Sequence, residues 1–129
     1  MKTPRTIRWG IIGLGKIANK FATDLQTVQH SELYAVASRQ QEKANSFAKQ
    51  HNATKAYGDY ESLAADPNID AIYIATPHSF HKEYTILCLN HKKAVLCEKP
   101  LAMNLQEVEE MIAAANANNV LLMEALWTY

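Results

Sequence analysis

A glycine-rich turn near the start of the chain has the residue types and the spacing that can hold a diphosphate. A short apolar run of strand type leads directly into the pattern Gly13-x-Gly15-x-x-Ala18. Gly13 permits a tight turn, Gly15 lets the backbone approach a pyrophosphate, and Ala18 allows a helix to pack closely on the strand. The helix opening after the turn presents free N–H groups and the positive end of its dipole. We therefore predict that a dinucleotide is bound by Gly13, Gly15, Lys16, Ile17 and Ala18.

The residues after the next apolar run bear on which dinucleotide fits. Leu33–Ala37 has the composition of a buried strand, and Ser38-Arg39 follows it. At this place an acid bonds the ribose hydroxyls of NAD, whereas a cation accepts the 2′-phosphate of NADP. Arg39 can give bidentate bonds to a phosphate, and Ser38 adds a hydroxyl without a repulsive charge. Ser38 and Arg39 together predict that the domain prefers NADP(H). NAD(H) is the alternative, because Glu42 can also reach the ribose and Arg39 can be a solvated loop residue.

A third group of polar residues follows the apolar run Ala71–Ile74. Pro77 stiffens the turn there, at the sheet edge where the nicotinamide half of the cofactor would lie. His81 begins the next helix, where a neutral imidazole can bond the cofactor ribose, although a histidine in a first helical turn is often structural. His78 is a weaker candidate. We predict cofactor contacts from Thr76, Pro77 and His81.

The tripeptide Glu98-Lys99-Pro100 places an ionisable pair after a further apolar run. A lysine that is partly desolvated beside a nicotinamide can hold a substrate oxygen by a hydrogen bond and pass it a proton. Pro100 cannot continue a strand ladder, so the chain turns there and leaves Lys99 at the rim. We predict that Lys99 is catalytic and that Glu98 orients it or contacts the cofactor ribose. The alternative is a solvated ion pair in a loop.

Strand-like and helix-like patterns alternate along the chain without a repeat, a low-complexity tract or a linker. Such alternation favours right-handed crossovers and an α/β fold with a parallel sheet. We predict a doubly wound Rossmann sheet of about six strands in the order 3-2-1-4-5-6, with ligands at the carboxyl ends of the strands. The expected strands are 7–12, 33–37, 55–57, 71–74, 94–97 and 120–125.

The helices between these strands are recognised by their caps and apolar faces. Asp59 can cap a short helical turn, and Asn104 with Glu107 is a variant of the capping box. We expect helices from Lys16, over 41–51, over 80–89 and after Asn104, and the first, second and last of these have an apolar face. On the first helix this face is Ile17, Phe21, Ala22, Leu25 and Val28; on the second it is Ala44, Phe47 and Ala48; on the last it is Val108, Met111, Ile112 and Ala115.

Composition and charge exclude several classes of protein. The 129 residues fit one domain, and 48% hydrophobic with 20% charged residues is typical of a globular protein. The 13 basic and 13 acidic residues give zero formal net charge, which argues against a nucleic-acid or membrane partner. No spacing resembles a metal site, and the apolar N-terminal run is too short for a membrane span or a leader. We expect a cytoplasmic protein in which Cys88 and Cys97 are reduced.

Taken together and in register, these motifs resemble the glucose-fructose oxidoreductase, inositol dehydrogenase and MocA family. The resemblance spans essentially the whole chain. Members of that family use NAD or NADP to oxidise a hydroxyl of a sugar, polyol or cyclic diol, or to reduce the matching carbonyl. The resemblance implies that Lys99 is the catalytic lysine, Arg39 the 2′-phosphate ligand, His81 a cofactor contact and Trp127 part of the substrate pocket wall. The motifs that carry it are 13–18, 75–77 with His81, 98–100 and 123–127.

The same resemblance implies how the chain is organised. Residues 1–125 correspond to the NAD(P)-binding domain, and residues 126–129 to the start of a connection to a C-terminal α+β substrate domain that this chain lacks. We expect this piece alone to be inactive and the full-length enzyme, acting on a small hydroxy or carbonyl compound, to be a homo-oligomer. One alternative is a nucleotide-sensing regulator on the same fold, although the tripeptide 98–100 argues against it. A third is an interaction module without cofactor affinity.

Overall fold

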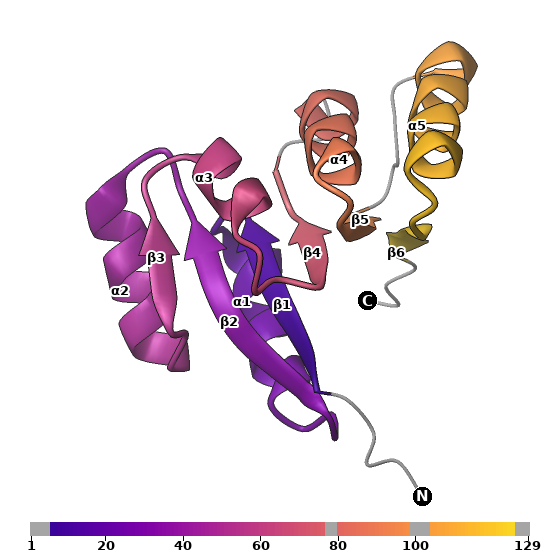
Figure 1. Cartoon of the computed structure of the whole chain (residues 1–129). Coiled ribbons are helices and arrows are strands. Elements are labelled where there is room, and N and C mark those ends of the chain that lie inside the picture. The colour runs from indigo at the N-terminus through magenta and orange to yellow at the C-terminus, as the bar shows by residue number, and fades with distance from the viewer. Residues whose placement is uncertain (1–5, 77–79, 99–103, 126–129) are drawn as a thin grey trace, which may run out of the picture.

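Strands and helices alternate through the part of the chain that the computed structural model describes, which is residues 6–76, 80–98 and 104–125 (Figure 1). The strands are β1 (Ile7–Ile12), β2 (Ser31–Ala37), β3 (Lys55–Tyr57), β4 (Ala71–Ile74), β5 (Ala94–Glu98) and β6 (Leu122–Ala125). The helices are α1 (Lys16–Leu25), α2 (Gln41–His51), α3 (Tyr60–Ala65), α4 (His81–Asn90) and α5 (Leu105–Asn118). Within those described ranges, none of the helices is both long and apolar enough to cross a membrane.

The described strands form a six-stranded parallel sheet in the order β3-β2-β1-β4-β5-β6. This order confirms the predicted doubly wound Rossmann fold. The chain runs outward from β1 to β3 and then crosses to β4 on the other side of β1, so the carboxyl ends of β1 and β4 lie at the point where the winding direction changes. Doubly wound sheets bind their ligands at this point.

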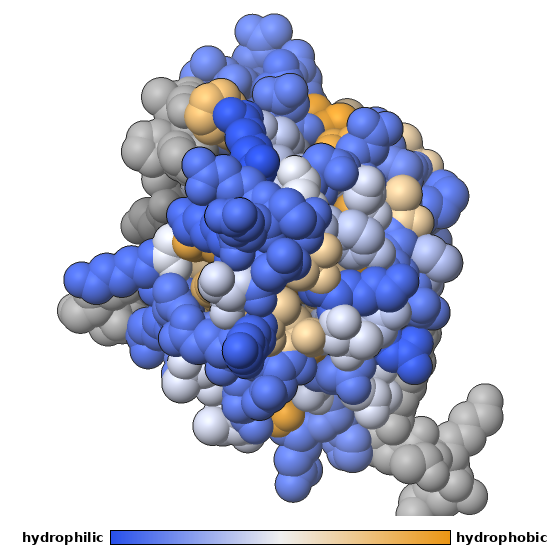
Figure 2. Space-filling view, turned by 90° about the vertical axis from the view of Figure 1, so that its left-hand side faces the viewer, coloured by the Kyte–Doolittle hydropathy of each residue, from blue (hydrophilic) through white to orange (hydrophobic). Residues whose placement is uncertain are grey.

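Both faces of the sheet are covered, which is why the buried parts of the strands are apolar on both sides. On one face α1 and α2 pack against the sheet, and on the other face α3, α4 and α5 do so. The face of the molecule on the side of α2 and β3 is mainly hydrophilic (Figure 2). The first core includes Ile11, Phe21, Leu33, Val36, Phe47 and Tyr73, and the second includes Ile12, Leu63, Ile72, Leu89, Val95 and Ala115.

Two predicted helix caps are confirmed. Oδ1 of Asp59 accepts a hydrogen bond from the backbone N–H of Ser62 at 2.7 Å, which starts α3. Oδ1 of Asn104 accepts from the N–H of Glu107 at 3.0 Å, which starts α5. Each side chain satisfies a backbone donor that would otherwise lack a partner in the first helical turn.

Two residues expected on buried helix faces are exposed, so these assignments were wrong. Val28 is 51% exposed, because α1 ends at Leu25 and the following turn, in which the N–H of Val28 donates to the Leu25 carbonyl, carries it into solvent. Ile112 is 47% exposed, because Met111 and Ala115, four residues apart, occupy the buried stripe of α5. A residue adjacent to that stripe points away from the sheet.

The two thiols are free and buried, as predicted. Cys88 lies on α4 and Cys97 on β5, and both belong to the core beneath α3, α4 and α5. Burial raises the pKa of both thiols, that of Cys97 to about 12. They are therefore protonated core residues at neutral pH.

Candidate functional site

The turn between β1 and α1 requires glycine at its first position. Gly13 has a φ of +90°, and a Cβ atom there would lie 2.9 Å from the carbonyl carbon of Ala75, on the loop that leaves β4. No other residue type fits both the dihedral angle and the space. The close approach holds the β1–α1 turn against the end of β4.

Gly15 lacks a side chain for a different reason. It is the N-cap of α1, is exposed, and makes no side-chain cap hydrogen bond. A Cβ atom at Gly15 would meet nothing within 4 Å. Protein packing therefore does not explain the glycine, and the space beside the N-terminus of α1 is open to a ligand. Ala18, one turn later, is fully buried against the sheet, which matches its expected role in close packing.

A hollow of about 560 Å³ opens above this turn and gathers most of the predicted cofactor residues at the carboxyl ends of the strands. It extends from the glycine turn to the ends of β2, β4 and β5. Of the predicted residues, those that line it are Gly13, Gly15, Lys16, Ile17, Ser38, Arg39, Thr76 and Glu98. Residues that were not predicted but also line it are Leu14, Gln40, Lys43, Tyr60 and Ala75.

The hollow is locally positive although the chain has zero formal net charge. Lys16, Arg39 and Lys43 supply three cations, and Glu98 supplies a carboxylate. Lys43 was missed, although its place in the first turn of α2, directly after the Arg39 loop, is a signal that sequence reading could have used. A cation at that place adds to the attraction for a phosphate group.

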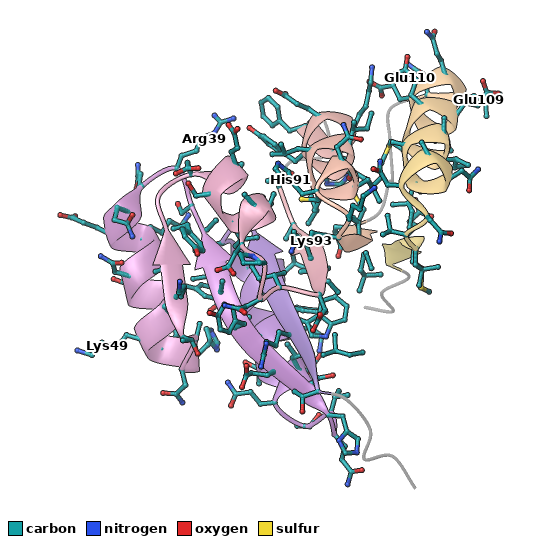
Figure 3. All side chains as sticks on the ribbon, in the orientation of Figure 1. Arg39, Lys49, His91, Lys93, Glu109 and Glu110 are labelled. Carbon is teal, nitrogen blue, oxygen red and sulfur yellow. The ribbon has the colours of Figure 1, made fainter. Side chains whose placement is uncertain are left out.

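Ser38 and Arg39 differ in how much freedom they have. Ser38 is buried, and its Oγ accepts a hydrogen bond from the N–H of Gln40 at 3.2 Å, which shapes the loop. Arg39 is exposed beside α3 (Figure 3), and its Nη2 donates to the hydroxyl of Tyr84. That hydrogen bond raises the pKa of the Arg39 guanidinium, so Arg39 is charged at every pH of interest.

His81 lies beneath the loop that leaves β4. Its side chain is fully buried, and Nε2 lies 2.7 Å from the carbonyl oxygen of Thr76. The bond ties the start of α4 to the loop that also contacts Gly13. The role of His81 as a direct ribose contact stays a prediction.

The carboxylate of Glu98 is held from below. Tyr73, fully buried in β4, donates a hydrogen bond from its hydroxyl to Oε2 of Glu98. The Tyr73 ring stacks on Phe21 of α1 at a centroid distance of 4.0 Å. This chain of contacts links the end of β5 to α1, the helix that follows the glycine turn. The predicted site residues Pro77, Lys99 and Trp127, and the weaker candidate His78, lie outside the described residues.

Comparison with known proteins agrees with this geometry. Residues 7–126 match the model of the GFO_IDH_MocA family, described as an oxidoreductase family with an NAD-binding Rossmann fold. The chain belongs to this family. The family model thus covers the motifs 13–18, 75–77 with His81 and 98–100, which carried the resemblance seen in the sequence together with 123–127.

The curated relatives include trans-1,2-dihydrobenzene-1,2-diol dehydrogenases. The protein of Xenopus tropicalis is 50% identical over 124 residues, which are 94% of this chain and 37% of that protein. The protein of Mus musculus is 51% identical over 124 residues, which are 95% of this chain and 37% of that protein. The motifs also resemble those of dimeric dihydrodiol dehydrogenase within the family. The chain spans about 37% of the length of these relatives.

Solved structures that are similar to this chain have the same fold. A probable dehydrogenase from Thermotoga maritima is 34% identical with a TM-score of 0.86, over 92% of this chain and 36% of that protein. KijD10, a 3-ketoreductase from Actinomadura kijaniata solved with TDP-benzene and NADP, is 31% identical with a TM-score of 0.89, over 93% of this chain and 38% of that protein.

The residues present fit a dinucleotide of the kind that this family binds. The open N-terminus of α1 at Gly15 suits a diphosphate, and the side chain that is missing there leaves room for one. Arg39 and Lys43 lie in the same hollow and suit a further phosphate. Among the described residues, no group of three or more His, Cys, Asp or Glu side chains is placed to hold a metal ion.

Proposed function

We propose that this domain binds NADP(H) in preference to NAD(H) and serves an oxidoreductase that acts on a CH–OH group of a sugar, polyol or cyclic diol, or on the matching carbonyl. One observation carries the cofactor proposal. A single hollow joins the unobstructed N-terminus of α1 at Gly15 to the cations Arg39 and Lys43. A cofactor that carries both a diphosphate and a 2′-phosphate requires two such anion-binding sites within one cavity.

The substrate class is supported by the relatives. Proteins about 50% identical to this chain are named as dihydrodiol dehydrogenases, and a structural neighbour is a ketoreductase. All of them act on a carbon that bears oxygen. We propose that the activity belongs to a full-length enzyme of the relatives' length and that these 129 residues alone are nearly inert, since the chain spans only about 37% of those relatives.

The chain's own residues have distinct parts in the proposed reaction. When bound, the nicotinamide supplies the carbon that takes up or gives the hydride. Lys99 would hold the substrate oxygen and exchange its proton, and Glu98, whose carboxylate accepts a hydrogen bond from Tyr73, would orient Lys99 or contact the cofactor ribose. Trp127 would form part of the pocket wall, and Thr76, Pro77 and His81 would hold the nicotinamide side. A cytoplasmic location and a homo-oligomeric enzyme complete the proposal.

Calorimetric titration with NADPH and NADH tests the cofactor proposal. Charge-assisted bonds from Arg39 to the 2′-phosphate contribute roughly 1.5 to 3 kcal/mol, so NADPH should bind about tenfold to a hundredfold more tightly. Arg39→Ala should erase this preference and leave NADH affinity nearly unchanged. Lys49→Ala, which removes an exposed charge from the far end of α2 (Figure 3), is the matched control. Equal affinities for the two cofactors in the wild-type protein would refute the preference.

A further inference from the structure

Three aromatic rings surround the guanidinium of Arg39. The guanidinium carbon lies 5.9 Å from the ring centroid of Tyr60, 5.4 Å from that of Phe80 and 5.9 Å from that of Tyr84. Rings within about 6 Å attract a cation through their quadrupoles. We call Tyr60, Phe80 and Tyr84 the aromatic cage.

The aromatic cage is held by contacts among its own members. The rings of Tyr60 and Tyr84 meet edge to face, with centroids 4.7 Å apart and planes at 83°. Phe80 lies 6.0 Å from Tyr84. Tyr60 belongs to α3, whereas Phe80 and Tyr84 belong to the N-cap and the first turns of α4. The cage is therefore built from α3 and the start of α4, outside the loop that carries Arg39.

Tyr84 adds a directional contact to this cage. Nη2 of Arg39 donates a hydrogen bond to the Tyr84 hydroxyl, which links the loop after β2 to α4. A guanidinium has five N–H donors in a fixed plane, so four remain after this bond. The bond restricts the orientation of the group and leaves the remaining donors for an anion.

Arg39 lies at a boundary where its orientation matters. It lines the hollow at the glycine turn, and it also lines a wider groove of about 780 Å³ between α3 and α4. An exposed arginine can point into either space, and each freely rotating bond that must be fixed on binding weakens affinity. The contacts with Tyr60 and Tyr84 reduce that freedom before any ligand arrives.

We propose that Tyr84 is a positioning residue that holds the guanidinium of Arg39 ready for the 2′-phosphate and thereby increases the preference for NADP(H) over NAD(H). This inference rests on the proposed function. Tyr84 touches Arg39 and is not itself a ligand of the phosphate. Its effect should therefore appear only with a cofactor that bears the 2′-phosphate and only while Arg39 is present.

The test is calorimetric titration of NADPH and NADH into four proteins: wild type, Tyr84→Phe, Arg39→Ala and the double variant. Tyr84→Phe keeps the ring and removes the hydroxyl. NADPH affinity should fall about threefold to tenfold, the effect of losing one hydrogen bond, with NADH affinity unchanged. In the Arg39→Ala background, the same substitution should change neither affinity. Tyr34→Phe, which removes from β2 a hydroxyl that accepts a hydrogen bond from Asn68, is the matched control.

The outcomes separate this inference from the proposed function. If wild type prefers NADPH but Tyr84→Phe stays within twofold of it, the positioning role is refuted and the proposed function stands. If Tyr84→Phe binds NADPH more tightly, Tyr84 competes with the phosphate for Arg39, and the inference is also refuted. If the wild-type protein binds NADPH and NADH equally tightly, the proposed preference for NADP(H) is refuted, and the positioning role of Tyr84 is refuted with it. Circular dichroism and thermal unfolding of each variant establish that it is folded.

Discussion

Gly13 and Thr76 are so close that a Cβ atom on Gly13 would lie 2.8 Å from the backbone nitrogen of Thr76. Contacts with backbone atoms cannot be relieved by moving a side chain. The φ of +90° at Gly13 adds strain for any other residue type. The relationship therefore makes Gly13 a requirement of the fold, whereas Gly15, two residues later, faces open space.

This difference predicts opposite results for two alanine substitutions. Gly13→Ala should lower the free energy of unfolding by about 2 to 4 kcal/mol, from backbone strain and overpacking. Gly15→Ala should change stability by less than about 1 kcal/mol but weaken dinucleotide binding at least tenfold, because the new methyl group occupies the approach to the α1 N-terminus. Urea unfolding and calorimetry measure the two effects. A Gly15→Ala protein with full cofactor affinity would contradict the diphosphate site.

Lys99→Met in the full-length enzyme tests the chemical role that the sequence assigns to this lysine. If Lys99 exchanges the proton, turnover should fall by roughly a hundredfold to ten-thousandfold while NADPH affinity hardly moves. The methionine keeps the length of the side chain and removes the ammonium. Single-turnover hydride transfer and cofactor affinity are measured on the same variant, with Lys49→Met as control. Unchanged hydride transfer would show that Lys99 does not exchange the proton and would favour the solvated ion pair with Glu98.

Lys93 is buried (Figure 3), and its side chain binds the loop between α3 and β4. Its Nζ donates to the carbonyl oxygens of Asp66 at 2.6 Å and Ile69 at 2.7 Å. Lys93→Met should lower the free energy of unfolding by about 1 to 3 kcal/mol, because two carbonyls lose their donor. Lys92→Met, at the exposed neighbouring position, should change it by less than about 1 kcal/mol. Equal effects in urea unfolding would show that the buried bonds contribute nothing.

His51 should make stability depend on pH. The ring is buried, with Nε2 2.8 Å from Oδ1 of Asn19, and burial lowers the pKa of His51 below 6.5. The unfolded chain therefore takes up a proton before the folded one does, so stability is lost as pH falls from about 6.5 through the lower folded-state pKa. His51→Gln should have a flatter profile between pH 7 and 5 in urea unfolding. A profile as steep as that of wild type would rule out this role.

Regular patterns made most of the fold predictable. Continuous apolar runs marked the buried parallel strands, and caps such as Asp59 marked helix starts. The glycine turn could be interpreted because each of its residues has a local steric role. The failures at Val28 and Ile112 arose where a helix end and the width of a buried stripe decide exposure.

The environment of Arg39 could not be predicted in this way. Its partner Tyr84 is separated from it by 45 residues, and the two meet only because α4 returns beside the loop after β2. The bond from Tyr73 to Glu98 likewise joins two residues that are 25 positions apart in the sequence and lie on the neighbouring strands β4 and β5. Local periodicity places each residue on a face of its element, whereas the pairing of side chains depends on how the elements pack.

The strand order also has a consequence for biosynthesis. β1 is made first, yet it lies in the interior of the sheet between β2 and β4. A nascent chain that has formed β1 to β3 still has an unpaired β1 edge, which stays open until Ala71–Ile74 leaves the ribosome. The backbone of Thr76, which braces Gly13, arrives later still. A chain that ended before this point would keep a half-sheet whose open edge can pair with another chain, so the pairing of β4 with β1 removes an edge that favours aggregation.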